Sequence, residues 1–250
     1  MKAYLKLLLL AAAQLYCTIT FGQATQKQIF RNNYTWISIN SNLFLNKHWF
    51  IMADAHLREN DFFASRSFIF GRVGLGYQIN NNLSAAAGYG NLLQAPSTPG
   101  WVTDADESRI FEQLQLTTSY GKLKLLQRLR IEQRWQQKII NDQKTGDNKY
   151  TNRFRYLLSA TLPVFKKSTL PQFTLSDELL LQSGAAVVYN PFDQNRIFIG
   201  IKQKINNTLS FDAGYMRIFQ QRNNGGSYTL SNTYRLFFYY TLPVKKHNNS

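Results

Sequence analysis

The sequence predicts an all-β fold, namely a transmembrane antiparallel up-and-down β-barrel of about twelve strands, with ten as the alternative count. Three observations support this. Apolar and polar residues alternate with a period of two from about residue 34 to residue 242. The alternating segments run for about 10 to 15 residues, whereas soluble strands centre on about 5 to 6. Short turns also alternate with long polar loops, which is typical of membrane barrels.

Eleven segments carry the alternation. They cover residues 33–44, 48–59, 65–79, 82–93, 107–120, 122–137, 149–164, 172–182, 194–206, 207–220 and 228–242. Single-chain bacterial barrels have an even number of strands, with both termini on the periplasmic side. We therefore expect that residues 23–33 add a twelfth strand, or that one segment has been merged or split.

The stretch RLRIEQRW, residues 128–135, has one charged and one apolar face, and the fold decides which of them points outward. Arg130 and Glu132 share one face of an extended chain, and Leu129 and Ile131 share the other. A soluble exported sandwich would bury the apolar face, whereas a membrane barrel would turn it to lipid. The long strands and the alternating connections favour the barrel.

The connections assign the two ends of the barrel. Short turns are expected at 45–48, 79–82, 120–122 and 205–207, and long loops at 93–107, 138–149, 182–194 and 220–227. Aromatic residues near strand ends suit interfacial girdles; these are Trp36, Trp49, Tyr77, Tyr120, Trp135, Tyr150, Tyr239 and Tyr240. Glycines and small residues on the polar faces leave room for bulky neighbours such as arginine in a confined interior.

The N-terminus predicts export. Lys2 and Lys6 precede an apolar run, and small residues follow near Gly22, which is the pattern of a cleaved secretory signal peptide at residues 1–22. The remainder, residues 23–250, is then a single outer-membrane β-barrel domain. Cys17, the only cysteine, lies in the signal, and Tyr16 before it argues against lipid attachment. The mature chain would therefore have neither disulfides nor thiol metal sites.

The formal charge is +15, or +13 without the two signal lysines. The basic residues are spread over many strands rather than gathered in one tail or helix, so we do not expect a nucleic-acid partner. The expected partners are outer-membrane lipid and small anionic solutes.

Several motifs, taken in order, identify a family. They are YTWISI (34–39), GRVGLGYQINNNLSAAAGYG (71–90), ESRIFEQLQL (107–116) with RLRIEQRW, NRFRYLLSATLPV (152–164), and NPFDQNRIFIGI (190–201) with NTLSFDAGYM (207–216). This order resembles the Gram-negative outer-membrane barrels named domain of unknown function 2490, common in Bacteroidota. The resemblance covers almost the whole mature chain. It implies a barrel of this size in the cell outer membrane, and it assigns no activity.

The candidate site is the set of charges expected to line the lumen. It comprises Arg58, Arg66, Arg72, Arg128, Arg130, Glu132, Arg134, Arg153, Arg155, Glu178, Arg196, Lys202, Lys204 and Arg235. Charges inside a narrow barrel must pair or stay hydrated. One interpretation is an interdigitated Arg/Glu plug that stiffens the barrel. The other is a basic lining that favours anions. The matching functions are a structural membrane component, and a channel or small-solute transport route.

An enzyme acting on lipid or a glycoconjugate is the alternative function. Only His48, His56 and His247 could serve as a histidine base, and no serine stands in a recognisable nucleophile motif. The acidic run DADE, residues 104–107, lacks the twelve-residue calcium-loop pattern. We therefore expect no catalytic residues, no metal and no cofactor.

Overall fold

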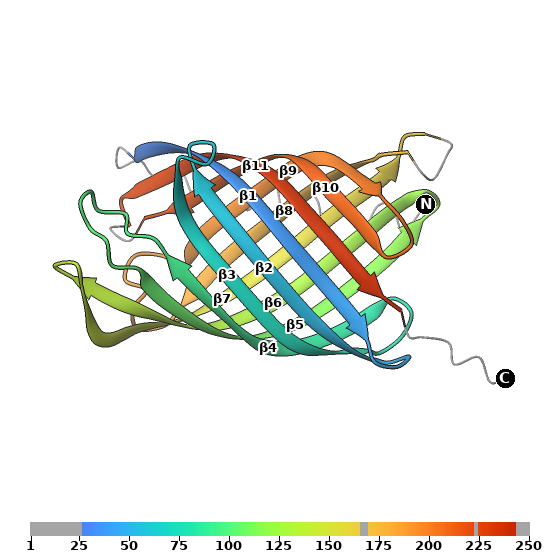
Figure 1. Cartoon of the computed structure of the whole chain (residues 1–250), viewed down its shortest axis with the longest axis horizontal. Helices are drawn as coiled ribbons and strands as arrows, with labels where there is room; N and C mark the ends of the chain where they lie inside the picture. The colour runs from blue at the N-terminus through green and yellow to red at the C-terminus, as the bar shows by residue number, and fades with distance from the viewer. Residues whose placement is uncertain (1–26, 166–169, 223–224, 244–250) are drawn as a thin grey trace.

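The structure, a computed structural model, describes residues 27–165, 170–222 and 225–243, so the expected signal peptide lies outside the described residues. These residues form eleven strands that close into one barrel (Figure 1). The strands are β1 (Gln28–Phe44), β2 (Trp49–Asn60), β3 (Ser65–Gln78), β4 (Leu83–Gln94), β5 (Ala105–Tyr120), β6 (Leu123–Ile140), β7 (Gln143–Pro163), β8 (Gln172–Ser183), β9 (Phe192–Lys204), β10 (Leu209–Gln221) and β11 (Ser227–Leu242). The all-β barrel is thereby confirmed. Within these ranges, no helix is long and apolar enough to cross a membrane.

The strand count differs from both predicted values. Each of the eleven segments forms one strand, and residues 28–33, where a twelfth strand was expected, extend β1 instead. All neighbouring strands are antiparallel except the closing pair, in which β1 runs parallel to β11, with Leu43 opposite Leu242. An odd number of up-and-down strands can only close in this way. The chain therefore enters and leaves the barrel at opposite ends.

We name the two ends by their connections. At the short-turn end the chain connects strands through residues 45–48, 79–82, 121–122, 164–171 and 205–208. At the long-loop end it does so through residues 61–64, 95–104, 141–142, 184–191 and 222–226. β1 begins at the long-loop end, and β11 finishes at the short-turn end.

One expected loop is a hairpin. Residues 138–149 were predicted as a long loop, but β6 and β7 pair through this region and are joined by only Asn141 and Asp142. Both residues have positive φ, 50° and 60°, as the central residues of a type I′ turn require, and Asn and Asp tolerate that conformation. The hairpin therefore projects from the long-loop end (Figure 1).

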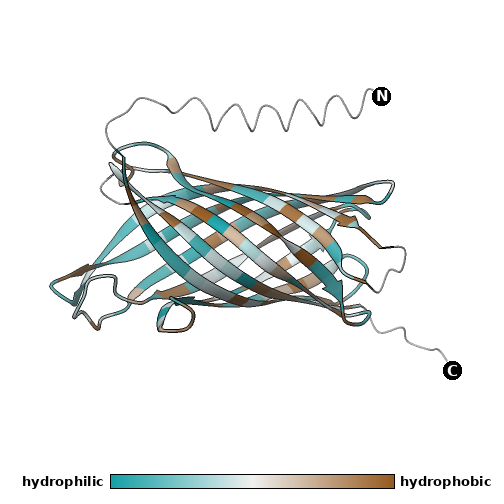
Figure 2. Ribbon diagram, turned by 90° about the horizontal axis from the view of Figure 1, so that it is seen from above, coloured by the Kyte–Doolittle hydropathy of each residue, from teal (hydrophilic) through white to brown (hydrophobic). Residues whose placement is uncertain are grey.

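The faces of the strands are arranged with apolar side chains outward. Leu129 and Ile131 are 56% and 39% exposed, whereas Arg130 and Glu132 between and beside them are 4% and 1% exposed. Figure 2 shows the same alternation of hydrophobic and hydrophilic residues along the strands. This arrangement contradicts the soluble sandwich, which needs the apolar faces packed together.

Two members of the expected aromatic girdles lie inside the barrel. Trp36 is 7% exposed, and the hydroxyl of Tyr239 donates a hydrogen bond to Asp212 at 2.6 Å. The prediction was wrong for them because it considered only how close each residue lies to a strand end. It did not consider that both positions fall on the inward face of their strands. Trp49 and Tyr77 are exposed, and their rings contact each other with centroids 4.9 Å apart.

Apolar side chains from neighbouring strands also pack inside the barrel. Phe50, Met52, Ala86 and Phe111 form a buried cluster there, with Phe44 packed against it. Glycines on the neighbouring strands make room for the rings. A Cβ on Gly76 would overlap the Phe50 ring, and one on Gly74 would lie 2.8 Å from Cζ of Phe111. The glycines therefore accommodate phenylalanine rather than the arginine that the sequence suggested.

Candidate functional site

A cavity of about 550 Å³ runs inside the barrel from the long-loop rim as far as Asn40, Ser176 and Tyr239, near the short-turn ends of β1, β8 and β11. It reaches the rim, where the exposed residues Asn32, Gln94 and Ser97 line it. Phe50 and Phe111 are not part of its lining. The space is therefore entered from between the long loops.

The lining is strongly basic. It contains two glutamates, Glu107 and Glu178, and eleven arginines: Arg58, Arg66, Arg72, Arg109, Arg128, Arg130, Arg134, Arg153, Arg155, Arg196 and Arg235. Five further carboxylates contact these arginines: Asp54, Asp104, Glu132, Asp193 and Asp212. Seven carboxylates thus face eleven guanidinium groups, which leaves an excess of four positive charges. Such an excess favours anions in the cavity.

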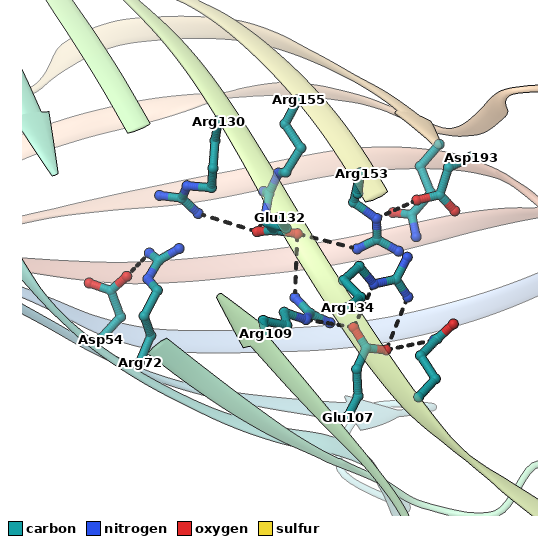
Figure 3. Close-up of polar contacts among 12 residues, drawn as sticks. Asp54, Arg72, Glu107, Arg109, Arg130, Glu132, Arg134, Arg153, Arg155 and Asp193 are labelled. Atoms are coloured by element: carbon teal, nitrogen blue, oxygen red, sulfur yellow. Dashed lines mark hydrogen bonds and ion pairs between the residues drawn. The ribbon is translucent and has the colours of Figure 1, made fainter. Parts of the chain in front are cut away.

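Glu132 is the centre of the ionic network (Figure 3). One of its carboxylate oxygens accepts a hydrogen bond from Nη1 of Arg155 at 2.7 Å. The Nη1 atoms of Arg109, Arg130 and Arg153 each lie 3.8 Å from this carboxylate. Burying an ion is costly unless it is paired, so this carboxylate and its arginines depend on one another.

Glu107 forms a second cluster nearer the rim. Its Oε1 accepts hydrogen bonds from Nε of Arg109 and Nε of Arg134, both at 2.6 Å. Its Oε2 accepts from the Gln136 amide, also at 2.6 Å. Since Arg109 also approaches Glu132, the two clusters are continuous.

Glu178 extends the network to β8 and β9. It accepts hydrogen bonds from Nη2 of Arg128 at 2.7 Å, Nη2 of Arg155 at 2.7 Å and Nη1 of Arg196 at 3.2 Å. Arg155 binds both Glu178 and Glu132 and so links these carboxylates. Further ion pairs surround this core. They are Arg72 with Asp54, Arg153 with Asp193 at 2.7 Å, Arg235 with Asp212 at 2.6 Å and Arg66 with Asp104 at 2.5 Å.

Arg58 is held differently from the other lining arginines. Among the described residues it contacts no carboxylate. Its Nε donates to Oγ of Ser67 at 3.3 Å, and its guanidinium lies over the rings of Tyr34 and Phe68, 4.4 and 4.3 Å from their centroids. The ring faces stabilise the cation. Its Nη atoms have no protein acceptor in the part of the chain that the structure describes.

The structure brings most of the predicted residues together. Eleven of the fourteen line the cavity: Arg58, Arg66, Arg72, Arg128, Arg130, Arg134, Arg153, Arg155, Glu178, Arg196 and Arg235. Glu132 lies behind this lining, in the network. Lys202 places Nζ 4.8 Å from the centroid of the Tyr239 ring, outside the cavity, and Lys204 is exposed at the end of β9.

Other site residues were missed. Glu107 was expected in a solvated loop with the rest of DADE, but it lies in β5 and is buried. Asp106 of the same run pairs with Lys144 at 2.6 Å. Phe68 and Phe70 line the cavity as well. Both residues alternate with the outward Ile69, so the period of two already places them on the inward face. They were missed because the interior was expected to be polar.

Among the described residues, neither His48 nor His56 makes a hydrogen bond to a serine side chain. His56 packs among aromatic rings, with its centroid 6.0, 5.5 and 5.7 Å from those of Trp36, Phe70 and Phe237. Nδ1 of His48 lies 3.0 Å from the backbone oxygen of Gln78, and His247 lies outside the described residues. In the described ranges no group of three or more His, Cys, Asp and Glu side chains could hold a metal ion.

A closed barrel with an apolar outer face and an interior of paired charges defines the class of this molecule, a β-barrel protein with an arginine-lined cavity. The chain belongs to the family described as "Protein of unknown function (DUF2490)", whose model matches residues 33–247. No curated protein and no solved structure matches the chain.

Proposed function

We propose that this chain is an integral outer-membrane protein of a Gram-negative bacterium and that it binds small anionic solutes in its arginine-lined cavity. The outward apolar residues support membrane insertion, because in water such a surface would favour aggregation. Leu129, Ile199 and Tyr234 are about half exposed on three different strands. The signal-like N-terminus supports export.

The observation that carries the solute-binding role is the lining of eleven arginines and two glutamates around an open space of about 550 Å³. A barrel that used these charges only for stiffening would pair them and fill the interior. Here many of the charges are paired, yet the interior keeps a cavity within the size range of small-molecule sites, about 300 to 1,000 Å³.

A continuous channel is a second use of the same lining. It requires that the cavity continue to the short-turn rim, whereas its lining stops at Asn40, Ser176 and Tyr239, and Phe44 and Phe50 pack nearer that rim. The geometry therefore favours binding from the long-loop side over free conduction. Anion-selective currents across planar bilayers, abolished by neutralising Arg128, Arg130 and Arg134 together, would favour the channel instead.

Location is tested by fractionation. The protein should appear in the outer-membrane fraction and migrate differently on gels with and without heating, as folded barrels do. Recovery of the folded protein in the soluble fraction, with no detergent, would contradict membrane insertion.

Solute binding is tested by calorimetric titration of inorganic phosphate into the detergent-solubilised protein at low ionic strength. Arg58→Gln should weaken phosphate binding about tenfold or more, because a charge-assisted hydrogen bond contributes about 1.5 to 3 kcal/mol. Arg217→Gln is the matched control, since Arg217 is exposed on β10 and outside the cavity lining. Absence of phosphate binding by the unmodified protein, or an equal effect of both variants, would contradict the proposal.

A further inference from the structure

The cavity has two chemically different walls. Arg128, Arg130, Arg134, Arg153, Arg155 and Arg196 line one wall, on β6, β7 and β9. Tyr34, Trp36, Phe68, Phe70 and Phe237 line the other, on β1, β3 and β11. Strands β3, β2, β1 and β11 are consecutive around the barrel, and β6 to β9 are consecutive on another part of it. The rings are therefore gathered on one side of the cavity. Arginines lie over them there: Arg58 over Phe68, Arg109 over Phe70 and Arg235 over Phe237, at 4.3, 4.9 and 4.2 Å from the ring centroids.

The aromatic wall is a packed surface. Trp36 meets the edges of Phe68 and Phe237, with ring centroids 5.6 and 5.4 Å away. These two ring pairs are near perpendicular, with interplanar angles of 87° and 76°, which is a favoured geometry for aromatic pairs. A rigid set of rings of this kind gives a flat ligand a surface to pack against.

Two polar features of this wall are unused by the protein. Nε1 of Trp36 has no hydrogen-bond partner among the described residues, although Trp36 is buried. Arg58, set into the same wall on β2, contacts aromatic faces and Ser67 but no carboxylate among those residues. Buried donors are normally satisfied, so the free Nε1 of Trp36 indicates a missing acceptor. Arg58, half-buried beside it, is a cation that such an acceptor could also contact.

We infer that the cavity is selective for anions that carry a planar aromatic ring, such as aryl phosphates. The anionic group would accept hydrogen bonds from Arg58 while the ring packs on Trp36, Phe68 and Phe237. This inference rests on the proposed anion-binding function and adds the substrate class to it. A compact inorganic anion uses the arginines alone and makes no contact with the rings.

Phenyl phosphate and methyl phosphate separate the two ideas, because they carry the same charge and only the first has a ring. Titrations into the detergent-solubilised protein, corrected with detergent alone, should show phenyl phosphate binding about tenfold more tightly, as expected for ring packing. Phe68→Leu should weaken phenyl phosphate binding more than methyl phosphate binding and so remove most of this preference. Phe111→Leu is the control, because Phe111 is buried in the cluster outside the cavity, and it should keep the preference.

The outcomes are distinguishable. Equal affinity for both phosphates in the unmodified protein would overturn the aryl selectivity and leave anion binding intact. Binding of neither would overturn the proposed function itself. A preference that survives Phe68→Leu, or that Phe111→Leu removes equally, would also overturn the inference. Heat-dependent gel mobility checks that each variant has a folded barrel.

Discussion

The carboxylate of Glu132 on β6 lies 2.7 Å from Nη1 of Arg155 on β7. In the register of these strands Glu132 is opposite Arg153, so Arg155 reaches it diagonally. Arg109 on β5 approaches the same carboxylate from the other neighbouring strand. One buried acid therefore connects three consecutive strands from inside the barrel.

Replacing this acid should destabilise the barrel strongly. Glu132→Gln keeps the shape but leaves buried arginines without their counter-charge, so the free energy of unfolding should fall by about 3 to 5 kcal/mol. Urea titration followed by tryptophan fluorescence measures it. Asp147→Asn is the control, because Asp147 is exposed in the β6–β7 hairpin that projects from the long-loop end; it should change stability by less than about 0.5 kcal/mol. Equal effects would show that the network does not stabilise the fold.

Glycine at position 88 is required by the close approach of β3 and β4. A Cβ there would overlap the carbonyl oxygen of Val73 and the Cα of Gly74, which are backbone atoms that cannot turn aside. Gly88→Ala should therefore lower the free energy of unfolding by about 1 to 3 kcal/mol. Gly71→Ala should be close to neutral, because its Cβ would meet nothing within 4 Å. Comparable urea midpoints for the two variants would contradict this packing.

The hairpin tip and the 95–104 loop should separate in acid. The Asp142 carboxylate accepts hydrogen bonds from the backbone N–H of Thr103 at 2.8 Å and of Val102 at 3.1 Å. The Thr103 N–H first, and then the Val102 N–H, hold the pKa of Asp142 below its usual 3.8. The stabilisation is thus present above pH 3.8 and lost as the pH falls through the lower folded value.

Hydrogen exchange tests this contact. Protection factors of the Val102 and Thr103 amides should drop on acidification below pH 3.8, and Asp142→Asn should remove that pH step while tolerating the positive φ at this position. A step of the same size in Asp142→Asn would show that another group controls the loop.

The parallel closure predicts that the two ends of the barrel chain lie on opposite sides of the membrane. An epitope ahead of Lys27 should share a side with one inserted between Ser97 and Thr98, and an epitope after Leu242 should lie on the other side. Antibody access in intact and permeabilised cells measures this. Equal access at both termini would require an even strand count.

The alternation of side chains along each strand explains why the inward and outward residues could be predicted from the sequence. Successive side chains of a strand point to opposite sides, so the assignment of Arg130 inward and Leu129 outward follows once the segment is extended. The strand count could not be obtained in this way. It depends on the pairing of β1 with β11, between Gln28 and Ser227 at one end, which no local pattern encodes. The even-number rule for bacterial barrels then led to twelve.

Composition misled the prediction in two places. The run of Asn, Asp, Lys and Gly in residues 138–149 is typical of loops, yet two turn residues suffice and the strands continue. The interior was expected to be polar throughout, and the aromatic wall that includes Phe68 and Phe70 was therefore missed. The closure of the barrel decides which inward side chains contact each other. The ion pairs of Glu132 could therefore not be predicted from the sequence either.

The central claim is that apolar side chains face lipid and charged ones face the interior. Because Cys17 is the only cysteine, single cysteines can carry spin labels in a Cys17→Ser background. In lipid bilayers, labels at Leu129, Ile131 and Ile199 should relax strongly with oxygen dissolved in the lipid, and labels at the inward Ser38 and Ser176 should not. Equal oxygen accessibility of the two sets, or a lipid-accessible interior set, would contradict the account.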